Sequence, residues 1–162
     1  MPDEQKPVPA SRFYVEFDSM SNMEFSKVSG LTMESKVQGQ NKPLMSKKGG
    51  VQIRQIKAAG FEGLFTLELT TLMSGDEKST SKTMYKWFQD CLPKGAKGKG
   101  NWDKSKKSGS IALYDPDGNE VMKWTITDAW PSEYKIADLN SGSNEYIEET
   151  YSIICANIKR TK

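Results

Sequence analysis

The residues that most often carry out chemistry in proteins are sparse in this sequence. Its 162 residues contain no histidine, so the commonest general base and the commonest metal ligand are both missing. Residues 79–82 match the S-x-x-K signature of acyl-enzymes, but the S-D-N and K-T-G motifs that accompany it are absent. A helix cap at Ser79 or Thr80 explains this stretch better than a nucleophile does.

A second candidate is the aspartate-rich stretch at residues 115–119, which resembles the start of a calcium loop. Asp115, Asp117 and Asn119 have the required spacing, but the glycine stands at the fourth position instead of the sixth. The twelfth position, where an EF-hand needs glutamate, is Ile126. Because aspartate, proline and glycine are also ordinary turn residues, we favour a structural turn over a metal site.

Three glutamates near the C-terminus resemble a pair of catalytic acids. Glu148 and Glu149 point to opposite faces of a strand, however, and Glu145 forms no obvious couple with either. We therefore expect these glutamates to lie on solvated strand faces. None of these stretches amounts to an active site, and the sequence predicts a protein that is not an enzyme and that uses no metal or cofactor.

Residues 94–107, called here the lysine-rich segment, contain six lysines, three glycines and Trp102. The lysines suit contact with phosphates, and Trp102 offers a surface on which a base could stack. The alternatives are a solvated loop, or a contact with the carboxylates of a neighbouring subunit. The formal charge of the whole chain is only +2, which argues against nucleic acid but leaves a monomeric nucleic-acid-binding β-barrel as the alternative function.

The clearest structural element is a hairpin within residues 109–130. Its arms, at residues 111–114 and 121–126, are rich in β-branched and aromatic residues. Pro116 has the backbone angle that suits the second position of a type I turn, and Gly118 can take the positive φ that follows. One face of the second arm is strongly apolar, as expected of a sheet that covers a core.

The remaining pattern predicts a mainly β domain. Apolar residues with helical spacing predict one helix at about residues 77–91, which Pro93 and Gly95 end. Further strands are predicted at residues 13–17, 23–28 (forming an opening hairpin with 13–17), 32–37, 51–59, 61–73 and 146–158. With a long polar loop at residues 38–50, these elements favour an antiparallel two-sheet β-barrel or sandwich with one flanking α-helix and long extended loops.

The domain organisation follows from length and composition. Residues 1–11 contain three prolines and no periodicity, which predicts a flexible arm, and residues 12–162 are long enough for a single domain. The first residues carry acids and prolines where a signal peptide needs an apolar core, and no apolar run reaches membrane-spanning length. We therefore expect synthesis in the cytoplasm and no membrane insertion. Cys91 and Cys155 are expected to be buried free thiols.

Three stretches together resemble a known family: residues 13–31 (FYVEFDSMSNMEFSKVSGL), 109–134 (GSIALYDPDGNEVMKWTITDAWPSEY) and 138–151 (DLNSGSNEYIEETY). Their order, with a polar loop and the helix containing Trp87 and Phe88 between them, is similar to that of the inner tube proteins of contractile injection systems. This family includes the tail tube proteins of contractile-tailed phages. The haemolysin-coregulated protein of type VI secretion is related in fold.

This resemblance implies a structural subunit that forms homohexameric rings, which stack into a hollow tube that sheath contraction drives through a target envelope. The implied partners are other copies of the chain, sheath protein, and baseplate, spike and tube-terminating proteins, with a cargo effector or DNA in the lumen. The implied location is an assembled phage tail or tail-like particle, which some systems release extracellularly. The segment at residues 38–57 corresponds to the family's extended loop that reaches a neighbouring subunit, and its expected contacts are Lys42, Pro43, Leu44, Met45, Lys47, Lys48, Val51 and Ile53. Ring stacking or sheath contact is expected at Lys97, Lys99, Trp102, Lys104, Asp115 and Asp117.

Overall fold

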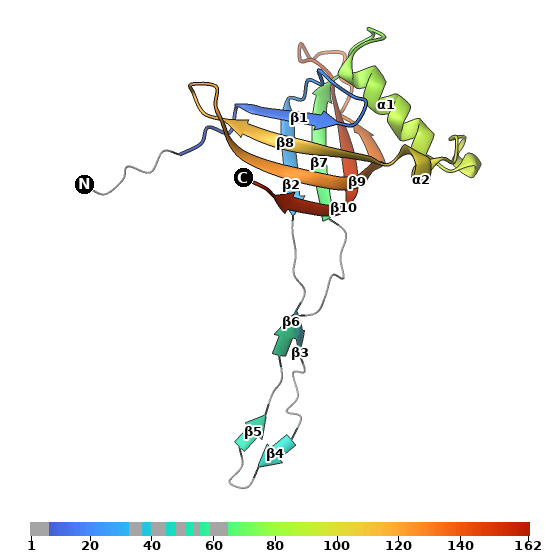
Figure 1. The fold of residues 1–162 in the computed structure, drawn as a ribbon. Coiled ribbons are helices and arrows are strands. Elements are labelled where there is room, and N and C mark those ends of the chain that lie inside the picture. The colour runs from blue at the N-terminus through green and yellow to red at the C-terminus, as the bar shows by residue number, and fades with distance from the viewer. Residues whose placement is uncertain (1–6, 33–36, 40–44, 48–50, 54–55, 59–64) are drawn as a thin grey trace.

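The computed structural model describes residues 7–32, 37–39, 45–47, 51–53, 56–58 and 65–162, and β-strands dominate it (Figure 1). This confirms the mainly β prediction. The elements are β1 (Phe13–Phe17), β2 (Lys27–Thr32), β3 (Val37–Gly39), β4 (Met45–Lys47), β5 (Val51–Ile53), β6 (Ile56–Ala58), β7 (Phe65–Leu72), α1 (Thr80–Cys91), the short 3-10 helix η1 (Lys94–Ala96), α2 (Trp102–Ser105), β8 (Lys107–Tyr114), β9 (Glu120–Ile136) and β10 (Glu148–Arg160).

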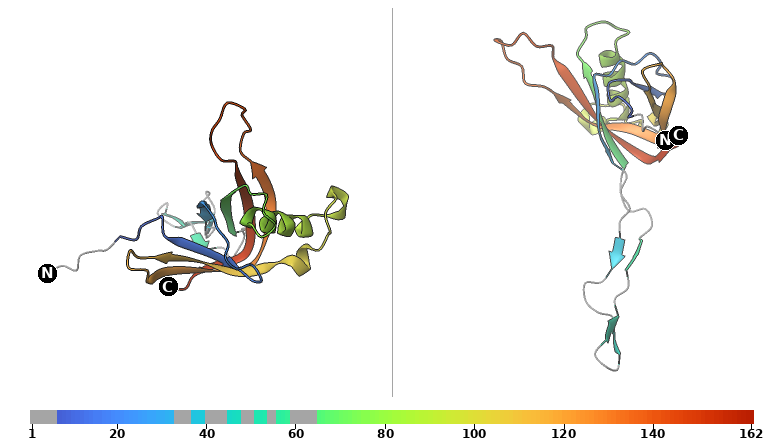
Figure 2. Two further views of the ribbon diagram at one scale, coloured as in Figure 1. Left: turned by 90° about the horizontal axis from the view of Figure 1, so that it is seen from above. Right: turned by 90° about the vertical axis from the view of Figure 1, so that its left-hand side faces the viewer.

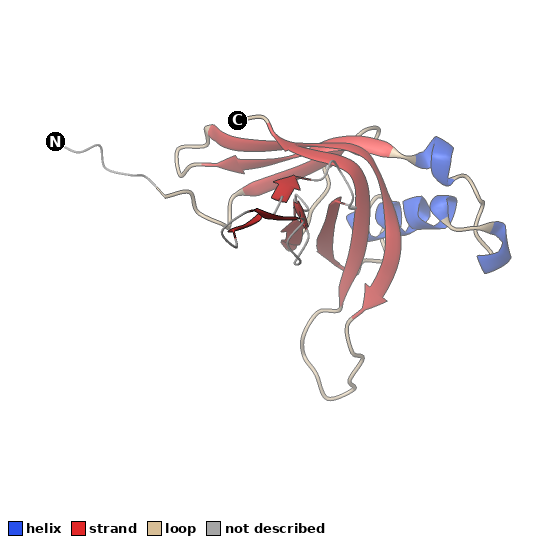
Figure 3. Ribbon diagram, turned by 90° about the horizontal axis from the view of Figure 1, so that it is seen from below, coloured by secondary structure: helices blue, strands red, loops and turns tan. Residues whose placement is uncertain are grey.

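The main sheet has six antiparallel strands in the order β1-β8-β9-β10-β7-β2. It curls strongly, so that it wraps around its own concave face (Figure 3). The long strands β9 and β10 bend where their pairing slips between Ser152 and Ile153, and where Asp128 has a φ of 48°. The predicted packing of two sheets is not confirmed, because bending lets a single sheet enclose the core among the described strands.

The predicted hairpin is confirmed and is longer than expected. Its arms are β8 and β9, which pair from Lys107 and Ala129 to Tyr114 and Glu120. The strands continue beyond the apolar run because ladder hydrogen bonds, which every residue except proline can donate, extend the pairing into polar sequence. The turn between them is closed by Asp115, whose carbonyl accepts a 3.1 Å hydrogen bond from the N–H of Gly118.

The predicted opening hairpin is wrong. Strand β1 pairs with β8, whereas β2 pairs with β7, so the two strands lie at opposite edges of the sheet. The connection between them does begin with a turn, in which the N–H of Met20 donates a 3.0 Å hydrogen bond to the Phe17 carbonyl, but it buries Met20 and Met23 in the core instead of joining two paired strands. Strand β2 begins at Lys27 and continues beyond the predicted end at residue 28 to Thr32, with a φ of 65° at Gly30 and a shift in its register with β7.

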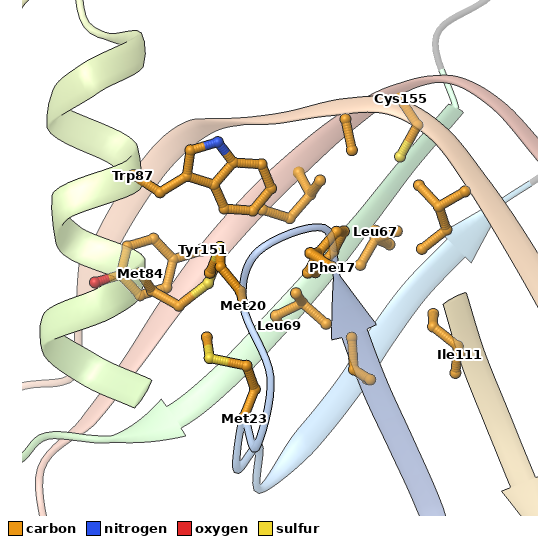
Figure 4. Close-up of a cluster of buried hydrophobic side chains, with 14 of the residues drawn as sticks. Phe17, Met20, Met23, Leu67, Leu69, Met84, Trp87, Ile111, Tyr151 and Cys155 are labelled. Atoms are coloured by element: carbon orange, nitrogen blue, oxygen red, sulfur yellow. The ribbon is translucent and has the colours of Figure 1, made fainter. Parts of the chain in front are cut away.

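The hydrophobic core fills the concave face of the sheet and is closed by α1 (Figure 4). Side chains from β1, β7 and β10 meet Met84 and Trp87 of the helix, and the ring of Phe17 lies 5.1 Å from that of Trp87. Each fully buried large apolar side chain stabilises the fold by roughly 1.5–3 kcal/mol. Cys91 and Cys155 are buried free thiols, as predicted.

Helix α1 begins at Thr80, three residues later than predicted, because Ser79 is its cap. The Oγ atom of Ser79 accepts a 3.3 Å hydrogen bond from the N–H of Lys82, which satisfies one of the free donors of the first turn. The predicted end near residue 91 is confirmed. The lysine-rich segment, however, is not simply a loop, because it contains η1 and α2.

The segment at residues 37–58 is also more regular than predicted. Its described parts form two antiparallel pairs, β3 with β6 and β4 with β5, where the sequence predicted a polar loop followed by one weak strand. These pairs lie away from the six-stranded sheet (Figures 1 and 2). The predicted strand at 32–37 lies largely outside the described residues, as does part of the predicted flexible arm at 1–11.

Candidate functional site

The expected subunit contacts at residues 42–53 are only partly described. The structure places Met45 opposite Ile53 and Lys47 opposite Val51 on the paired strands β4 and β5. These four residues are thus paired within one antiparallel ladder. The other expected contacts lie outside the described residues: Lys42, Pro43, Leu44 and Lys48.

The lysine-rich segment folds back onto the end of α1. The backbone N–H groups of Lys99 and Asn101 donate hydrogen bonds of 3.1 and 3.0 Å to the carbonyls of Gln89 and Asp90. The Nζ atom of Lys99 also lies 2.9 Å from Oδ1 of Asp90, as an ion pair without the alignment of a hydrogen bond. Lys97 and Lys104 remain exposed. The segment is therefore fixed to the domain, and its backbone does not form a free loop.

Trp102 anchors the far end of the lysine-rich segment. Its ring lies 5.5 Å from the ring of Trp130 on β9, and 49% of its surface remains exposed. The Nζ atom of Lys106 lies 5.2 Å from the centre of the Trp102 ring and 2.8 Å from a carboxylate oxygen of Asp103. The hydrogen bond from Lys106 lowers the pKa of Asp103 and, in turn, raises the pKa of Lys106. Two of the six lysines, Lys99 and Lys106, are thus already paired with carboxylates.

Asp115 organises the turn that could have been a calcium site. Its Oδ1 accepts a 2.8 Å hydrogen bond from the N–H of Asn119, and its Oδ2 accepts one of 3.2 Å from the Asn119 amide. These bonds lower the pKa of Asp115, and the bond from the Asn119 N–H has the largest effect. Asp117 is exposed beside it, and Arg12 donates to the Pro116 carbonyl at 2.9 Å. Among described residues no group of three or more histidine, cysteine, aspartate or glutamate side chains could hold a metal.

Glu149 is buried, which contradicts the prediction of a solvated glutamate. Only 3% of its surface is exposed. Its Oε1 accepts a 2.9 Å hydrogen bond from the Tyr134 hydroxyl, and its Oε2 accepts bonds from Ser81 at 2.9 Å and from Tyr151 at 3.3 Å. A carboxylate in this position is stable because its hydroxyl donors replace the water it has lost. No local sequence pattern indicates this burial, since the donors come from α1, β9 and β10.

An aromatic cluster surrounds Glu149 between α1 and the sheet. The rings of Tyr134 and Tyr151 lie 5.1 Å apart, and the ring of Tyr85 lies 5.3 Å from that of Tyr134. Burial first, and then the nearby Glu149, raises the pKa of both Tyr134 and Tyr151 well above the ordinary value. Both hydroxyls therefore stay protonated and donate to Glu149, which makes the cluster a structural tie between helix and sheet.

The end of the molecule at the β9–β10 connection carries exposed apolar and acidic residues. Strand β10 begins at Glu148 and not at the predicted residue 146, and Tyr146 is 85% exposed. A groove of about 790 Å³ lies here, which we call the acidic groove. It is lined by Leu72, Ala137, Asp138, Leu139, Asn140, Ser141, Ser143, Glu145, Tyr146, Ile147 and Glu148. Such a mixture of exposed apolar and charged residues is typical of a protein-binding surface.

These features suit contact between proteins more than chemistry on a small molecule. The buried carboxylate at Glu149 is satisfied by its hydroxyl donors, and the two thiols are inert because burial raises the pKa of Cys91 to about 11 and that of Cys155 to about 12. Within the residues that the structure describes, no helix has the length and apolar character needed to cross a membrane.

Comparison with known proteins identifies the family. Residues 9–159 match the family of the T4-like virus tail tube protein gp19. Among solved structures, the fold is similar to that in the anti-feeding prophage tube-terminating cap (TM-score 0.70, 16% identity, covering 98% of this chain and 93% of the other). It is also similar to that in the sheath-tube complex of the PVC extracellular contractile injection system (TM-score 0.63, 16% identity, covering 97% and 93%).

Hcp1 from Flavobacterium johnsoniae has a more distant likeness, with a TM-score of 0.50 and 13% identity over 93% of this chain and 94% of the other. No curated protein matches the sequence. The similar solved structures show the fold alone, whereas the family match, which spans nearly the whole chain, shows the family. The chain belongs to the T4-like virus tail tube protein gp19 family and is a structural subunit of a tube.

Proposed function

We propose that this chain forms the inner tube of a contractile injection system or phage tail, as homohexameric rings that stack around a hollow lumen. The observation that carries the proposal is the match of residues 9–159 to a tail tube family. Proteins with a similar fold occur in a sheath-tube complex, a baseplate and a tube-terminating cap. The corresponding partners here are sheath, baseplate and cap proteins, with a cargo effector or DNA in the lumen.

The topology of the main sheet supports self-assembly. Strands β1 and β2 are its two edges, and an edge strand leaves one row of backbone N–H and C=O groups without a partner in the sheet. Pairing the β1 edge of one copy with the β2 edge of the next would satisfy these groups on both copies. Because the two edges are different surfaces, this contact is heterologous, and heterologous contacts with closed rotational symmetry generate rings.

We assign the remaining expected contacts as follows. The described residues Met45, Lys47, Val51 and Ile53 contact a neighbouring subunit, together with the adjoining positions 42–44 and 48. Ring stacking or sheath contact involves the exposed Lys97, Lys104 and Asp117, and the half-exposed Trp102. Lys99 and Asp115 support these contacts from within, because each already has a partner in its own chain. The chain is made in the cytoplasm and works in the assembled particle, which some systems release.

Electron microscopy of the purified protein tests this function directly. The expected result is six-membered rings, and stacked tubes at high protein concentration. Monomers alone across a wide concentration range, with baseplate proteins present, would overturn the proposal. A salt-sensitive shift of nucleic acid that disappears when the lysines of the lysine-rich segment are neutralised would instead favour the nucleic-acid-binding alternative.

A further inference from the structure

The acidic groove holds three carboxylates with no counterpart of opposite charge. Asp138, Glu145 and Glu148 line it, and no lysine or arginine does. Neither of the two ion pairs among the described residues involves these side chains, and none of them accepts a hydrogen bond there. Residues 136–158 as a whole contain four acids and no basic residue. The groove is therefore a concentrated negative surface in a chain whose net charge is slightly positive.

Apolar side chains accompany these carboxylates. Six of the large hydrophobic side chains that the structure leaves exposed lie at this end: Leu72, Met73, Ile136, Leu139, Tyr146 and Ile147. Four of them line the acidic groove itself. Burying this surface is favourable only against a partner that supplies apolar contacts as well as positive charge.

One segment of the same chain has that composition. Residues 37–58, which we call the basic arm, contain Lys42, Lys47, Lys48, Arg54 and Lys57 and no acidic residue. Between these cations stand apolar residues, among them Met45 on β4 and Val51 and Ile53 on β5. The basic arm therefore matches the acidic groove in both properties.

The basic arm cannot readily reach the groove of its own chain. Strands β3 to β6 lie beyond one end of the six-stranded sheet, and the β9–β10 connection projects from the other (Figures 1 and 2). A basic arm at one end of the molecule and an acidic groove at the other would make a head-to-tail contact between copies, and such a contact can repeat without limit.

We propose that the acidic groove binds the basic arm of a second copy of this chain. The proposal rests on the proposed function and deepens it, because it names the acceptor surface on the neighbouring subunit and the chemistry of the contact. Carboxylates of the groove pair with ammonium and guanidinium groups of the basic arm. Leu139, Tyr146 and Ile147 pack against the apolar residues of the arm.

The lysine-rich segment is the other cationic candidate, and it fits less well. Two of its lysines are already paired, Lys99 with Asp90 and Lys106 with Asp103. Its one large apolar side chain with half its surface exposed, Trp102, is packed on Trp130. It therefore offers charge without a matching apolar strip.

Zero-length cross-linking identifies the occupant. A water-soluble carbodiimide joins a carboxylate to a lysine amine only where the two are in contact. Assembled rings or tubes are made from a mixture of ¹⁵N-labelled and unlabelled chains, and the cross-linked peptides are read by mass spectrometry. The expected products join Glu145 or Glu148 of one chain to Lys47 or Lys57 of another. Cross-links from the groove to the lysine-rich segment instead, or none to the basic arm, would overturn the proposal.

Charge reversal provides a second test with its own rescue. Glu145→Lys with Glu148→Lys, and separately Lys47→Glu with Lys57→Glu, should each raise the protein concentration needed for assembly by roughly tenfold or more. The four changes together should restore it to within about twofold. Single-surface variants that assemble normally, or a combined variant no better than they are, would contradict the contact.

These outcomes separate the contact from the function. Circular dichroism of each variant establishes that the monomer is folded before assembly is measured. A wild-type protein that forms no rings or tubes refutes the proposed function. A wild-type protein that assembles, but without cross-links between groove and arm, refutes only this inference.

Discussion

The Oγ atom of Ser81 donates a 2.9 Å hydrogen bond to Oε2 of Glu149, and this bond ties helix α1 to the beginning of strand β10. Both residues are buried, and Glu149 also accepts the hydroxyls of Tyr134 and Tyr151. A helix of twelve residues has little stability of its own in water. Its position therefore depends on its apolar stripe and on this polar contact.

Replacing Glu149 should destabilise the fold strongly. Glu149→Ala leaves the buried hydroxyls of Ser81 and Tyr151 and the half-buried hydroxyl of Tyr134 without this acceptor, and we expect the free energy of unfolding to fall by roughly 2–5 kcal/mol. Glu148→Ala is the matched control, because Glu148 is exposed on the same strand, and it should change stability by less than about 0.5 kcal/mol. Urea denaturation of the unassembled protein measures both. Equal midpoints for the two variants would show that the Glu149 contacts are unimportant.

Gly109 allows β1 and β8 to approach closely. A Cβ atom at this position would lie 2.2 Å from the Glu16 carbonyl oxygen and 2.7 Å from Cδ1 of Phe17. Gly109→Ala should therefore push β1 off the sheet and cost about 3 kcal/mol. At Gly75 an added Cβ meets nothing within 4 Å, so Gly75→Ala should be nearly neutral. Hydrogen exchange of the β1 amides, expected to accelerate only in the first variant, measures the effect locally.

Trp87 fixes the lysine-rich segment through its indole. Its Nε1–H donates a 2.7 Å hydrogen bond to the Ser105 carbonyl at the end of α2. Trp87→Phe removes the donor, and we expect trypsin to cleave after the lysines of residues 94–107 at least about fivefold faster, since local opening costs at least about 1 kcal/mol less. Trp124→Phe, on β9, serves as the control. Unchanged cleavage in Trp87→Phe would mean that other contacts hold the segment.

Stability should fall in alkaline solution. Burial raises the pKa of Cys155 to about 12, against an ordinary value of 9.0. The raised pKa belongs to the folded state, and the unfolded chain keeps the ordinary pKa of 9.0. The contribution of Cys155 to the free energy of unfolding is therefore fully present below pH 9 and is lost as the pH rises toward 12. Between these limits the unfolded thiol ionises and the folded one does not, which costs about 1.4 kcal/mol per pH unit.

Cys155→Ala tests this assignment. The variant lacks the thiol, so its free energy of unfolding should fall less steeply than that of the wild type between pH 9 and 11, in urea titrations at each pH. Cys91, with its pKa raised to about 11, and the tyrosines Tyr134 and Tyr151 continue to contribute in both proteins. Parallel slopes for wild type and variant would show that Cys155 does not titrate differently in the folded state.

Local chemistry explains what the sequence predicted well. The β8–β9 turn was predictable because Asp115, Pro116 and Gly118 determine it within four residues, and α1 because its apolar stripe and the Ser79 cap are contiguous. The failures concern contacts between distant residues. Nothing near β1 indicates that it pairs with β8, about 95 residues away in sequence, rather than with β2. Likewise, the burial of Glu149 depends on Ser81 and Tyr134, which lie on other elements.

The candidate site was predictable to a similar degree. Composition alone drew attention to the lysine-rich segment and to residues 38–57. It did not reveal that Lys99 and Lys106 are already paired within the chain. Lys99 meets Asp90, and Lys106 meets Asp103, only once α1 and α2 have folded. The acidic groove was missed because Leu72 and the β9–β10 connection come together only in the sheet.

The place of β10 in the sheet has a consequence for how the chain matures. Among the described strands, β1, β8 and β9 form one half of the sheet and β7 and β2 the other, and β10 joins them. Because β9 and β7 each pair with β10, a chain in which β10 has not yet docked exposes two further strand edges, one in each half. Docking of β10 is therefore the folding step after which β1 and β2 are the two edges of this sheet.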